Sequence, residues 1–414
     1  MVKSKLHQSN NLILTAIDFC SSFTSRFRTA LSAPPNWTPP SDARIHPTKV
    51  FDARIFIAIK FVLFLSVFLL GKPVNRNQFF NYDARWPSTG PPVLLSRLAC
   101  IDAADYLYLA KTGYRTGSRF CAFYPLWPWI LKYSGAAESQ RAPLYSTAIS
   151  IFFWGLGLSI LYRWIRNTAD PNLANSIILT SLALPSSIFF WLGYTESLFF
   201  FLTVVYVTNF DSPRWWLSVI VAGLIPLTRP VGVFVIAVPT LALMVKPSNR
   251  SRVFFQLGSC LAGYLCYLVT LWLATGNPTE GFRAQRLYTN QPNLDHFLRP
   301  LELIDRFFSI EGWHTPTGSI LDRLMFSWYI LLLIPLWRIR PLWFFWALPM
   351  VVVPAFTNWF LSFSRFTIVI LPLTLSLGFW LHFCDKIIFR SFLLFGLINQ
   401  WYLLNRYFSF DWAS

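Results

Sequence analysis

Long apolar stretches alternate with short polar turns along most of this 414-residue chain. From residue 54 onward, nearly uncharged stretches of about 20 residues recur, the length that a helix needs to cross the hydrocarbon core of a bilayer. Because 55% of the residues are hydrophobic and only 13% are charged, the chain cannot cover a soluble globule with polar surface. The pattern predicts an all-α, polytopic transmembrane helical bundle of about 11 spans, at 55–71, 143–162, 172–188, 195–209, 214–228, 230–245, 253–275, 318–337, 341–357, 366–383 and 387–405.

Three segments are expected to lie outside the membrane. Residues 1–53 are polar and rich in Ser, Asn and Pro, which is typical of a partly disordered cytoplasmic tail. The membrane domain then occupies 54–414 and contains two large loops, 72–142 and 276–317. No internal repeat of the kind found in many transporters is visible in the sequence.

Basic residues gather in alternate turns between the expected spans. These turns contain Arg163 and Arg166, Arg214, Lys246 with Arg250 and Arg252, Arg338 and Arg340, and Lys386 and Arg390. Such a distribution marks cytoplasmic turns, so we expect a cytoplasmic N-terminus and both large loops on the opposite face. The net charge of +17 therefore indicates a protein oriented in a lipid bilayer, with no nucleic acid as partner. The modest length and the lack of an evident retention signal favour a bacterial plasma membrane over the endoplasmic reticulum.

Three isolated charges interrupt the apolar stretches. Glu196 lies in GYTESLFF, Arg229 in LTRPVG and Arg365 in SFSRF, each at a turn on the face of the large loops. A charge near membrane depth is costly, so it extends to water from a helix end, lines a wet cavity, pairs with another charge or contacts a charged ligand. Three such residues on one side, in short turns, weaken the first interpretation. Two cations and one acid suit an anionic substrate with hydroxyl groups, such as a lipid phosphate carrying a sugar.

The first loop contains two acidic residues that share a helix face, Asp102 and Asp105 in CIDAADYLYLAKTGY. Asp102 is expected at the helix start, where it would cap free amide groups, with Asp105 near the third helical position. A carboxylate at that place can also act as a general base. The two interpretations are compatible.

Other candidates leave their alternatives open. His296 and His314 lie in the second loop without the spacing of a metal-binding set, so metal dependence stays undetermined. Cys100 and Cys121 lie in the first loop and would pair only if the compartment is oxidising and the geometry allows it.

Six segments follow one another in an order that resembles a known enzyme family. They read IDAADYLYLAKTGY, AFYPLWP, LPSSIFFWLGYTESLFF, LTRPVGVFV, FRAQRLY and SRFTIVILP. The first two resemble the pattern WD-x-x-x-Y-L-x-I-A-x-x-GY followed by FFPLYP, and the others resemble later segments of the same family. This family is the PIG-V-like mannosyltransferases, part of the GT-C superfamily of polyprenyl-phosphate-sugar-dependent glycosyltransferases. The resemblance covers roughly residues 97–375.

The resemblance implies an inverting transferase that moves mannose from a polyprenyl- or dolichyl-phosphate donor to a glycolipid or glycan acceptor on the non-cytoplasmic face. It makes Asp102 the catalytic base. The lipid-phosphate sugar is the donor co-substrate, and no other cofactor is expected. The candidates for substrate and donor-phosphate contact are Asp105, Glu196, Arg229, Arg283, Gln285 and Arg365.

One position departs from the family pattern. Ile101 stands where the family usually has Trp, which removes an aromatic contact beside Asp102. This departure leaves open a non-catalytic subunit of a transferase complex. A membrane transporter or lipid flippase is the alternative from another class, although it would favour charges near mid-span and a detectable repeat.

Overall fold

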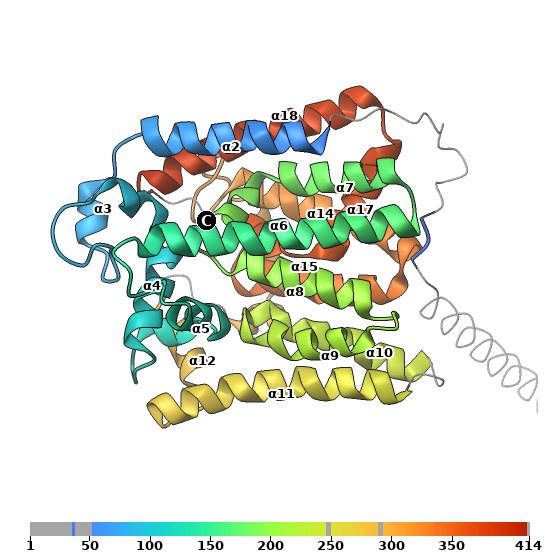
Figure 1. Cartoon of the computed structure of the whole chain (residues 1–414), viewed down its shortest axis with the longest axis horizontal. Helices are drawn as coiled ribbons and strands as arrows, with labels where there is room; N and C mark the ends of the chain where they lie inside the picture. Colours follow the sequence, from blue (N-terminus) through green and yellow to red (C-terminus); the bar gives the residue numbers. More distant parts are fainter. Residues whose placement is uncertain (1–34, 38–51, 246–249, 289–292, 412–414) are drawn as a thin grey trace, which may run out of the picture.

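The structure is a computed structural model that describes residues 35–37, 52–245, 250–288 and 293–411. Within these ranges the chain forms α-helices and short 3-10 helices, with a single isolated β-bridge between Gly312 and Ser319 and no sheet. The long helices run side by side as one bundle (Figure 1). The all-α fold class expected from the sequence is confirmed.

Five helices of the described chain are long and apolar enough to cross a membrane. They are α2 (Ala53–Leu70), α6 (Ala142–Thr168), α11 (Arg250–Thr275), α14 (Ile320–Ile339) and α18 (Lys386–Phe408). Helix α7 (Pro171–Ala183) and the 3-10 helix η3 (Pro185–Trp191) meet the same criterion together, but they bend by 86° at their junction. The protein is therefore an integral, multi-pass membrane protein.

Shorter apolar segments complete the bundle. They are α8 (Glu196–Asn209), α9 (Trp215–Leu224) with η4 (Ile225–Leu227), η5 (Pro230–Ile236) with α10 (Ala237–Val245), α15 (Pro341–Thr357) and α17 (Leu371–Phe383). Each of the 11 spans expected from the sequence overlaps one of the long, bent or short segments. These segments are too short to cross a bilayer as single regular helices, and several of them are separated by breaks in the chain.

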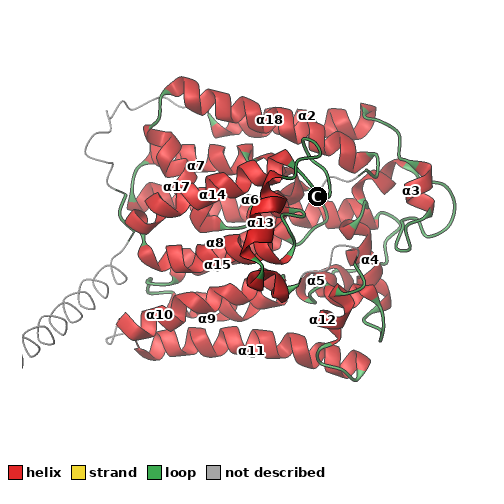
Figure 2. Ribbon diagram, turned by 180° about the vertical axis from the view of Figure 1, so that it is seen from behind, coloured by secondary structure: helices red, strands yellow, loops and turns green. Residues whose placement is uncertain are grey.

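The two large loops contain helices of their own. The first loop forms α3 (Arg76–Phe80), η1 (Leu94–Leu98), α4 (Asp102–Thr112), η2 (Arg119–Ala122) and α5 (Leu126–Tyr133). The second loop forms α12 (Glu280–Gln285), η7 (Leu294–Leu298) and α13 (Pro300–Phe308). Helices α3, α4, α5 and α12 gather at one end of the bundle (Figure 1), and α13 runs across the direction of the long helices (Figure 2).

The bend between α7 and η3 is stabilised by polar side chains from two other helices. Lys60 of α2 donates from Nζ to the carbonyl oxygens of Leu182 at 3.1 Å and Ser187 at 3.2 Å. Gln400 of α18 donates from Nε2 to the carbonyl oxygens of Leu182 at 3.0 Å and Leu184 at 3.1 Å. A break in a membrane helix leaves carbonyl groups without helical partners, and these bonds supply the partners. The charge inside the first span is thus explained by the break.

The span expected at 172–188 is present as the bent pair α7 and η3, and Pro185 accounts for the bend. Pro185 has no amide hydrogen to continue the hydrogen-bond ladder of α7, and it disfavours helical geometry in the residue before it. The helix ends at Ala183, and the chain turns into η3. This turn leads directly to Glu196 at the start of α8.

Only a small part of the tail expected at 1–53 belongs to the described residues. Trp37 packs with its ring centre 6.1 Å from Trp164, 6.4 Å from Trp343 and 6.0 Å from Phe379. The amide of Asn36 donates to the carbonyl oxygen of Ile339 at 2.8 Å. Residues 35–37 are therefore packed against the bundle, while 1–34 and 38–51 lie outside the described residues.

Candidate functional site

The three isolated charges of the apolar stretches lie where membrane helices are interrupted. Glu196 is the first residue of α8, after the bent pair. Arg229 separates η4 from η5 and has an extended backbone. Arg365 lies in the five-residue helix α16 (Phe363–Thr367). This helix begins directly after Ser362, which has a left-handed φ of 54°. Short, irregular segments at these points bring side chains from distant parts of the chain to one place.

The turn that carries Arg229 depends on a close approach of two backbone segments. A Cβ atom on Gly232 would lie 2.4 Å from the carbonyl oxygen of Ile225. The hydroxyl of Thr228 donates to the same carbonyl at 2.6 Å. Only glycine fits this approach, so the LTRPVG sequence folds as a compact turn and fixes the direction of Arg229.

Helix α16 is attached to the bundle by a buried acid that the sequence did not single out. Asp322 of α14 accepts from the amide of Ser364 at 2.7 Å, one residue before Arg365. Its own amide donates to Ser319 Oγ at 3.2 Å, and His314 Nδ1 lies 3.7 Å from its other carboxylate oxygen. Asp322 therefore positions Arg365 through the backbone. The only signal in the sequence was an acid within an expected span.

Four predicted residues meet in a chain of ion pairs. Arg365 places Nη1 2.7 Å from Asp102 Oδ2, and its Nε donates to Glu196 Oε1 at 2.7 Å. Arg229 places Nη1 2.7 Å from the same Glu196 oxygen. The side chain of Asp102 is 21% exposed, whereas those of Glu196, Arg229 and Arg365 are 0%, 5% and 4% exposed. The four charges balance, and only Asp102 offers an accessible edge.

Aromatic rings enclose the two guanidinium groups. The Arg365 guanidinium lies 4.4 Å from the ring centre of Tyr194 and 5.2 Å from that of Phe189. The Arg229 guanidinium lies 5.5 Å from the ring of Phe366. Such rings favour a cation while excluding water, which strengthens every charge interaction nearby. Tyr194 belongs to a segment that the sequence analysis quoted, but its role was not anticipated.

Asp102 begins α4 but does not cap it. The capping position is occupied by Ile101, whose φ of 51° is unfavourable for a β-branched residue, and no side chain caps the helix. The expectation that Asp102 is the capping residue is therefore wrong. Because its carboxylate does not bind the amides of its own helix, it points to Arg365 instead.

Asp105 lies beside the ion-pair chain. Its side chain is buried, and it accepts from the Tyr82 hydroxyl at 2.7 Å and faces Arg119 Nη2 at 3.4 Å. Burial, together with the nearby charge of Asp102, raises the pKa of Asp105 to about 8. Tyr82 and Arg119 were not anticipated, because partners so far along the chain leave no local pattern.

Arg283 and Gln285 are not brought to the ion-pair chain. Arg283 places Nη1 3.3 Å from Glu280 Oε2 and is 66% exposed. Gln285 donates to the carbonyl oxygen of Ala122 at 3.4 Å, and Glu280 accepts from the amide of Gly117 at 2.8 Å. The contacts with Ala122 and Gly117 join the second loop to the first loop, so helix α12 helps to hold η2 and the turn at Gly117 in place.

The remaining candidates have structural surroundings. Cys100 and Cys121 are free thiols, directed at the carbonyl oxygens of Arg97 and Arg115 at 3.2 Å in each case. His296 stacks on Trp359 with ring centres 4.2 Å apart. Across the residues that the structure describes, no group of three or more His, Cys, Asp or Glu side chains is placed to hold a metal ion.

Comparison with known proteins gives a distant likeness of fold. No family model and no curated protein matches the chain. Among solved structures, it is similar to ArnT from Cupriavidus metallidurans bound to undecaprenyl phosphate, with a TM-score of 0.44, 15% identity, and coverage of 79% of this chain and 58% of that one. The apo state of the same protein gives a TM-score of 0.43, 14% identity, and coverage of 82% and 61%. The chain thus spans about three fifths of these structures, and the function of the candidate site rests on its own geometry.

Proposed function

We propose that this protein is an inverting membrane glycosyltransferase of the GT-C type. It transfers a sugar, mannose in this proposal, from a polyprenyl- or dolichyl-phosphate donor to a glycolipid or glycan acceptor. The observation that carries the proposal is the meeting of Asp102, Glu196, Arg229 and Arg365 from four separate segments. Charges so near membrane depth are rarely retained without a functional partner.

The four residues supply the groups that such a transfer needs. Asp102 takes the proton of the acceptor hydroxyl as its oxygen bonds to the anomeric carbon of the donor. The bond from that carbon to the phosphate oxygen breaks, and its electron pair stays with the phosphate. Arg365 and Arg229 stabilise the added negative charge, in surroundings where such stabilisation is worth most. Glu196 holds both arginines in position.

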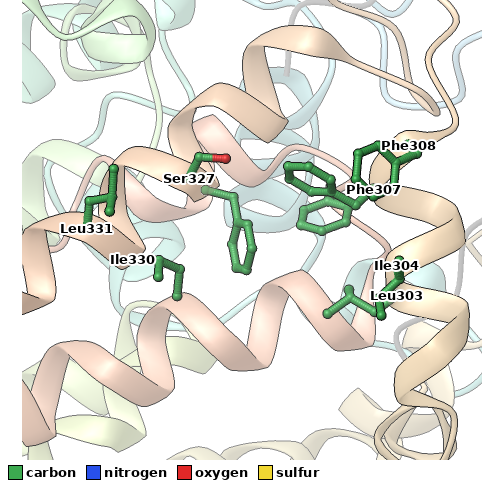
Figure 3. A pocket seen from close by; sticks show the side chains of 9 residues that line it. Leu303, Ile304, Phe307, Phe308, Ser327, Ile330 and Leu331 are labelled. Atoms are coloured by element: carbon green, nitrogen blue, oxygen red, sulfur yellow. The ribbon is translucent and has the colours of Figure 1, made fainter.

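An apolar groove supports a donor with a long hydrocarbon chain. A groove of about 420 Å³ lies between α13 and α14, with Leu303 and Phe307 on one side and Ser327 and Leu331 on the other (Figure 3). It is almost wholly apolar and of ordinary ligand size. Its wall includes Phe360, which belongs to the turn just before α16.

The groove is continuous with the segment that carries Arg365. Phe360 packs with its ring centre 6.2 Å from that of Phe363, the first residue of α16. Phe326 of the groove lies 5.5 Å from the same ring. The wall of the groove therefore packs directly against helix α16, which carries Arg365.

We also propose a bacterial plasma membrane, a cytoplasmic N-terminus and an extracytoplasmic site. Arg163 and Arg166 occupy the last turns of α6, whose first residue adjoins the first loop. The basic turn and the site thus lie at opposite ends of one helix, as expected when the basic end is cytoplasmic. Labelling of Asp83→Cys by a membrane-impermeant, thiol-reactive reagent in intact cells tests this orientation. Failure of the reagent to label this cysteine would indicate the opposite orientation.

The direct test is transfer by the purified protein. The protein receives polyprenyl-phosphate mannose with a radioactive sugar and an extract of membrane glycolipids and glycans. We expect label to move to an acceptor with wild type and not with Asp102→Asn. Failure of wild type to transfer would favour a transporter or a non-catalytic subunit, and equal transfer by the variant would remove Asp102 from the mechanism.

A further inference from the structure

We infer that Arg365 changes its partner when the donor lipid binds. Its guanidinium group leaves the Asp102 carboxylate and binds the donor phosphate, so donor binding frees Asp102 to act as the base. This inference rests on the proposed function and specifies how the same site is regulated. It makes Arg365 a phosphate-binding residue that blocks the reaction until the donor is present.

The starting point is the tight contact between the base and a cation. Asp102 Oδ2 lies 2.7 Å from Arg365 Nη1. An oxygen held this close by a guanidinium group has a donor already in place and is blocked on that side from a hydroxyl. The arrangement therefore corresponds, in this proposal, to a resting state in which Arg365 occupies Asp102.

A second observation shows that the cations have binding capacity left. Arg229 is buried and places Nη1 2.7 Å from Glu196 Oε1, at an angle outside that of a regular hydrogen bond. Two arginines share one oxygen of Glu196, because Arg365 Nε also donates to it. Each guanidinium carries several N–H donors and one carboxylate oxygen accepts only a few hydrogen bonds, so the pair is suited to a further acceptor with several oxygens.

Glu196 allows the exchange to occur without movement of the whole segment. The Nε of Arg365 is bonded to Glu196, while a different nitrogen, Nη1, faces Asp102. Arg365 can therefore turn one edge toward a phosphate while the other edge stays bound. Asp102 is the most exposed of the four side chains, so its side of the cluster is the one that an anionic group can reach.

The reaction order follows from this exchange. The donor phosphate displaces Asp102 from Arg365, and the released carboxylate then takes the proton of the acceptor hydroxyl. As the acceptor oxygen bonds to the anomeric carbon, the glycosyl bond to the phosphate breaks with its electron pair on the phosphate oxygen, and Arg365 is already bound to the group that gains the charge. When the acceptor binds without the donor, Asp102 is still paired with Arg365, so the acceptor hydroxyl is not deprotonated.

The test measures donor-analogue binding without any acceptor. The probe is a polyprenyl phosphate in detergent micelles, with the uncharged polyprenol of equal chain length as reference. In wild type, pairing of Arg365 with Asp102 competes with the phosphate and lowers its apparent affinity. Asp102→Asn removes this competition and is expected to bind the phosphate about tenfold more tightly than wild type. Arg365→Gln is expected to lose the preference for phosphate over polyprenol.

The matched control is Asp83→Asn, which removes an acid from the same loop. Asp83 is 78% exposed and lies 3.8 Å from Arg119, away from Arg365. It is expected to change binding by less than about twofold. Asp102→Ser repeats the test if the Asn variant folds poorly, with thermal unfolding as the check on folding.

The outcomes separate the two proposals. Tighter binding by the Asp102 variants alone supports the exchange. Unchanged or weaker binding by these variants, with wild type still preferring phosphate, overturns the exchange and leaves the proposed function standing. A wild type that binds polyprenol and its phosphate equally overturns the lipid-phosphate donor itself.

Discussion

Among the buried cations of the described bundle, Lys60 and the pair Arg229 and Arg365 have partners that differ in kind. Lys60 bonds the backbone carbonyl oxygens of Leu182 and Ser187 and lies 5.2 Å from the ring centre of Trp154. Arg229 and Arg365 face the carboxylates of other side chains. The Lys60 partners belong to a helix break that must stay satisfied for the bundle to fold. The partners of the arginines are side chains, which a ligand can replace.

This difference separates a charge bound to the backbone from one that a ligand can bind. A cation on backbone carbonyls has no alternative arrangement that keeps the backbone satisfied. A cation on carboxylates has an equivalent partner in any phosphate or carboxylate ligand. We therefore expect changes at Lys60 to act on stability, and changes around Arg365 to act on binding and transfer as well.

The largest effect is expected at Asp102. Replacing it with Asn keeps the shape of the side chain but removes the base, so transfer falls by about 10² to 10⁴-fold. The measurement is the initial rate of label transfer per folded protein. Asp83→Asn, an exposed acid of the same loop, is the control and keeps the wild-type rate within about twofold. A similar loss in both variants would place the effect in the loop and not in the base.

Glu196→Gln is expected to have the next largest effect, on folding. It leaves two buried arginines with one carboxylate, and removal of one partner from a buried ion pair costs about 3–5 kcal/mol of unfolding free energy. Unfolding in detergent gives the measurement. Glu302→Gln, on an exposed pair with Arg306 at 3.5 Å, is the control and changes stability by less than about 1 kcal/mol. Equal stability of the two variants would mean that the cluster is not electrostatically coupled.

Lys60→Met tests the other side of the comparison. The substitution removes the ammonium that satisfies two carbonyl groups, with an expected loss of about 1–3 kcal/mol. Transfer per folded molecule should stay within about twofold of wild type, because Lys60 does not contact the ion-pair chain. A variant with normal stability but strongly reduced transfer would make Lys60 part of the functional site.

The smallest effect is a pH dependence at Asp105. Its pKa rises from the ordinary 3.8 to about 8 in the folded protein. Between these values the folded state holds a proton that the unfolded state has released, so the unfolding free energy falls as pH rises and levels off above pH 8. Asp105→Asn should flatten this decline in thermal unfolding measured from pH 5 to pH 8.5. An identical slope in wild type and variant would show that Asp105 is ionised at neutral pH.

The sequence predicted those site residues that were anomalous where they stood. Glu196, Arg229 and Arg365 are single charges in long apolar stretches, and few physical explanations exist for a charge in such a place. Tyr82, Arg119 and Asp322 carried no such signal, because they lie among other polar residues or near a span end. Their contribution depends on contacts between distant segments, which a linear pattern does not contain.

The general course of the fold was also predictable, but its local irregularities were not. Hydrophobic stretches gave the positions of the membrane segments, since a bilayer imposes a length on any helix that crosses it. Pro185 marks in the sequence where the span is interrupted, but neither the 86° of the bend nor the positive φ of Ile101 follows from a linear pattern. Both depend on the surrounding tertiary contacts.

Under the proposed function, the groove beside α13 bears on the phase from which the donor arrives. Leu301 and Phe308 of α13 and Leu331 of α14 are exposed apolar side chains. An amphipathic helix with such a face rests in the interfacial layer of a bilayer, so we expect the groove to open sideways to lipid. The donor and the protein then meet by diffusion in the plane of the bilayer. Diluting the donor with inert lipid at constant bulk concentration should slow turnover, whereas adding buffer should not.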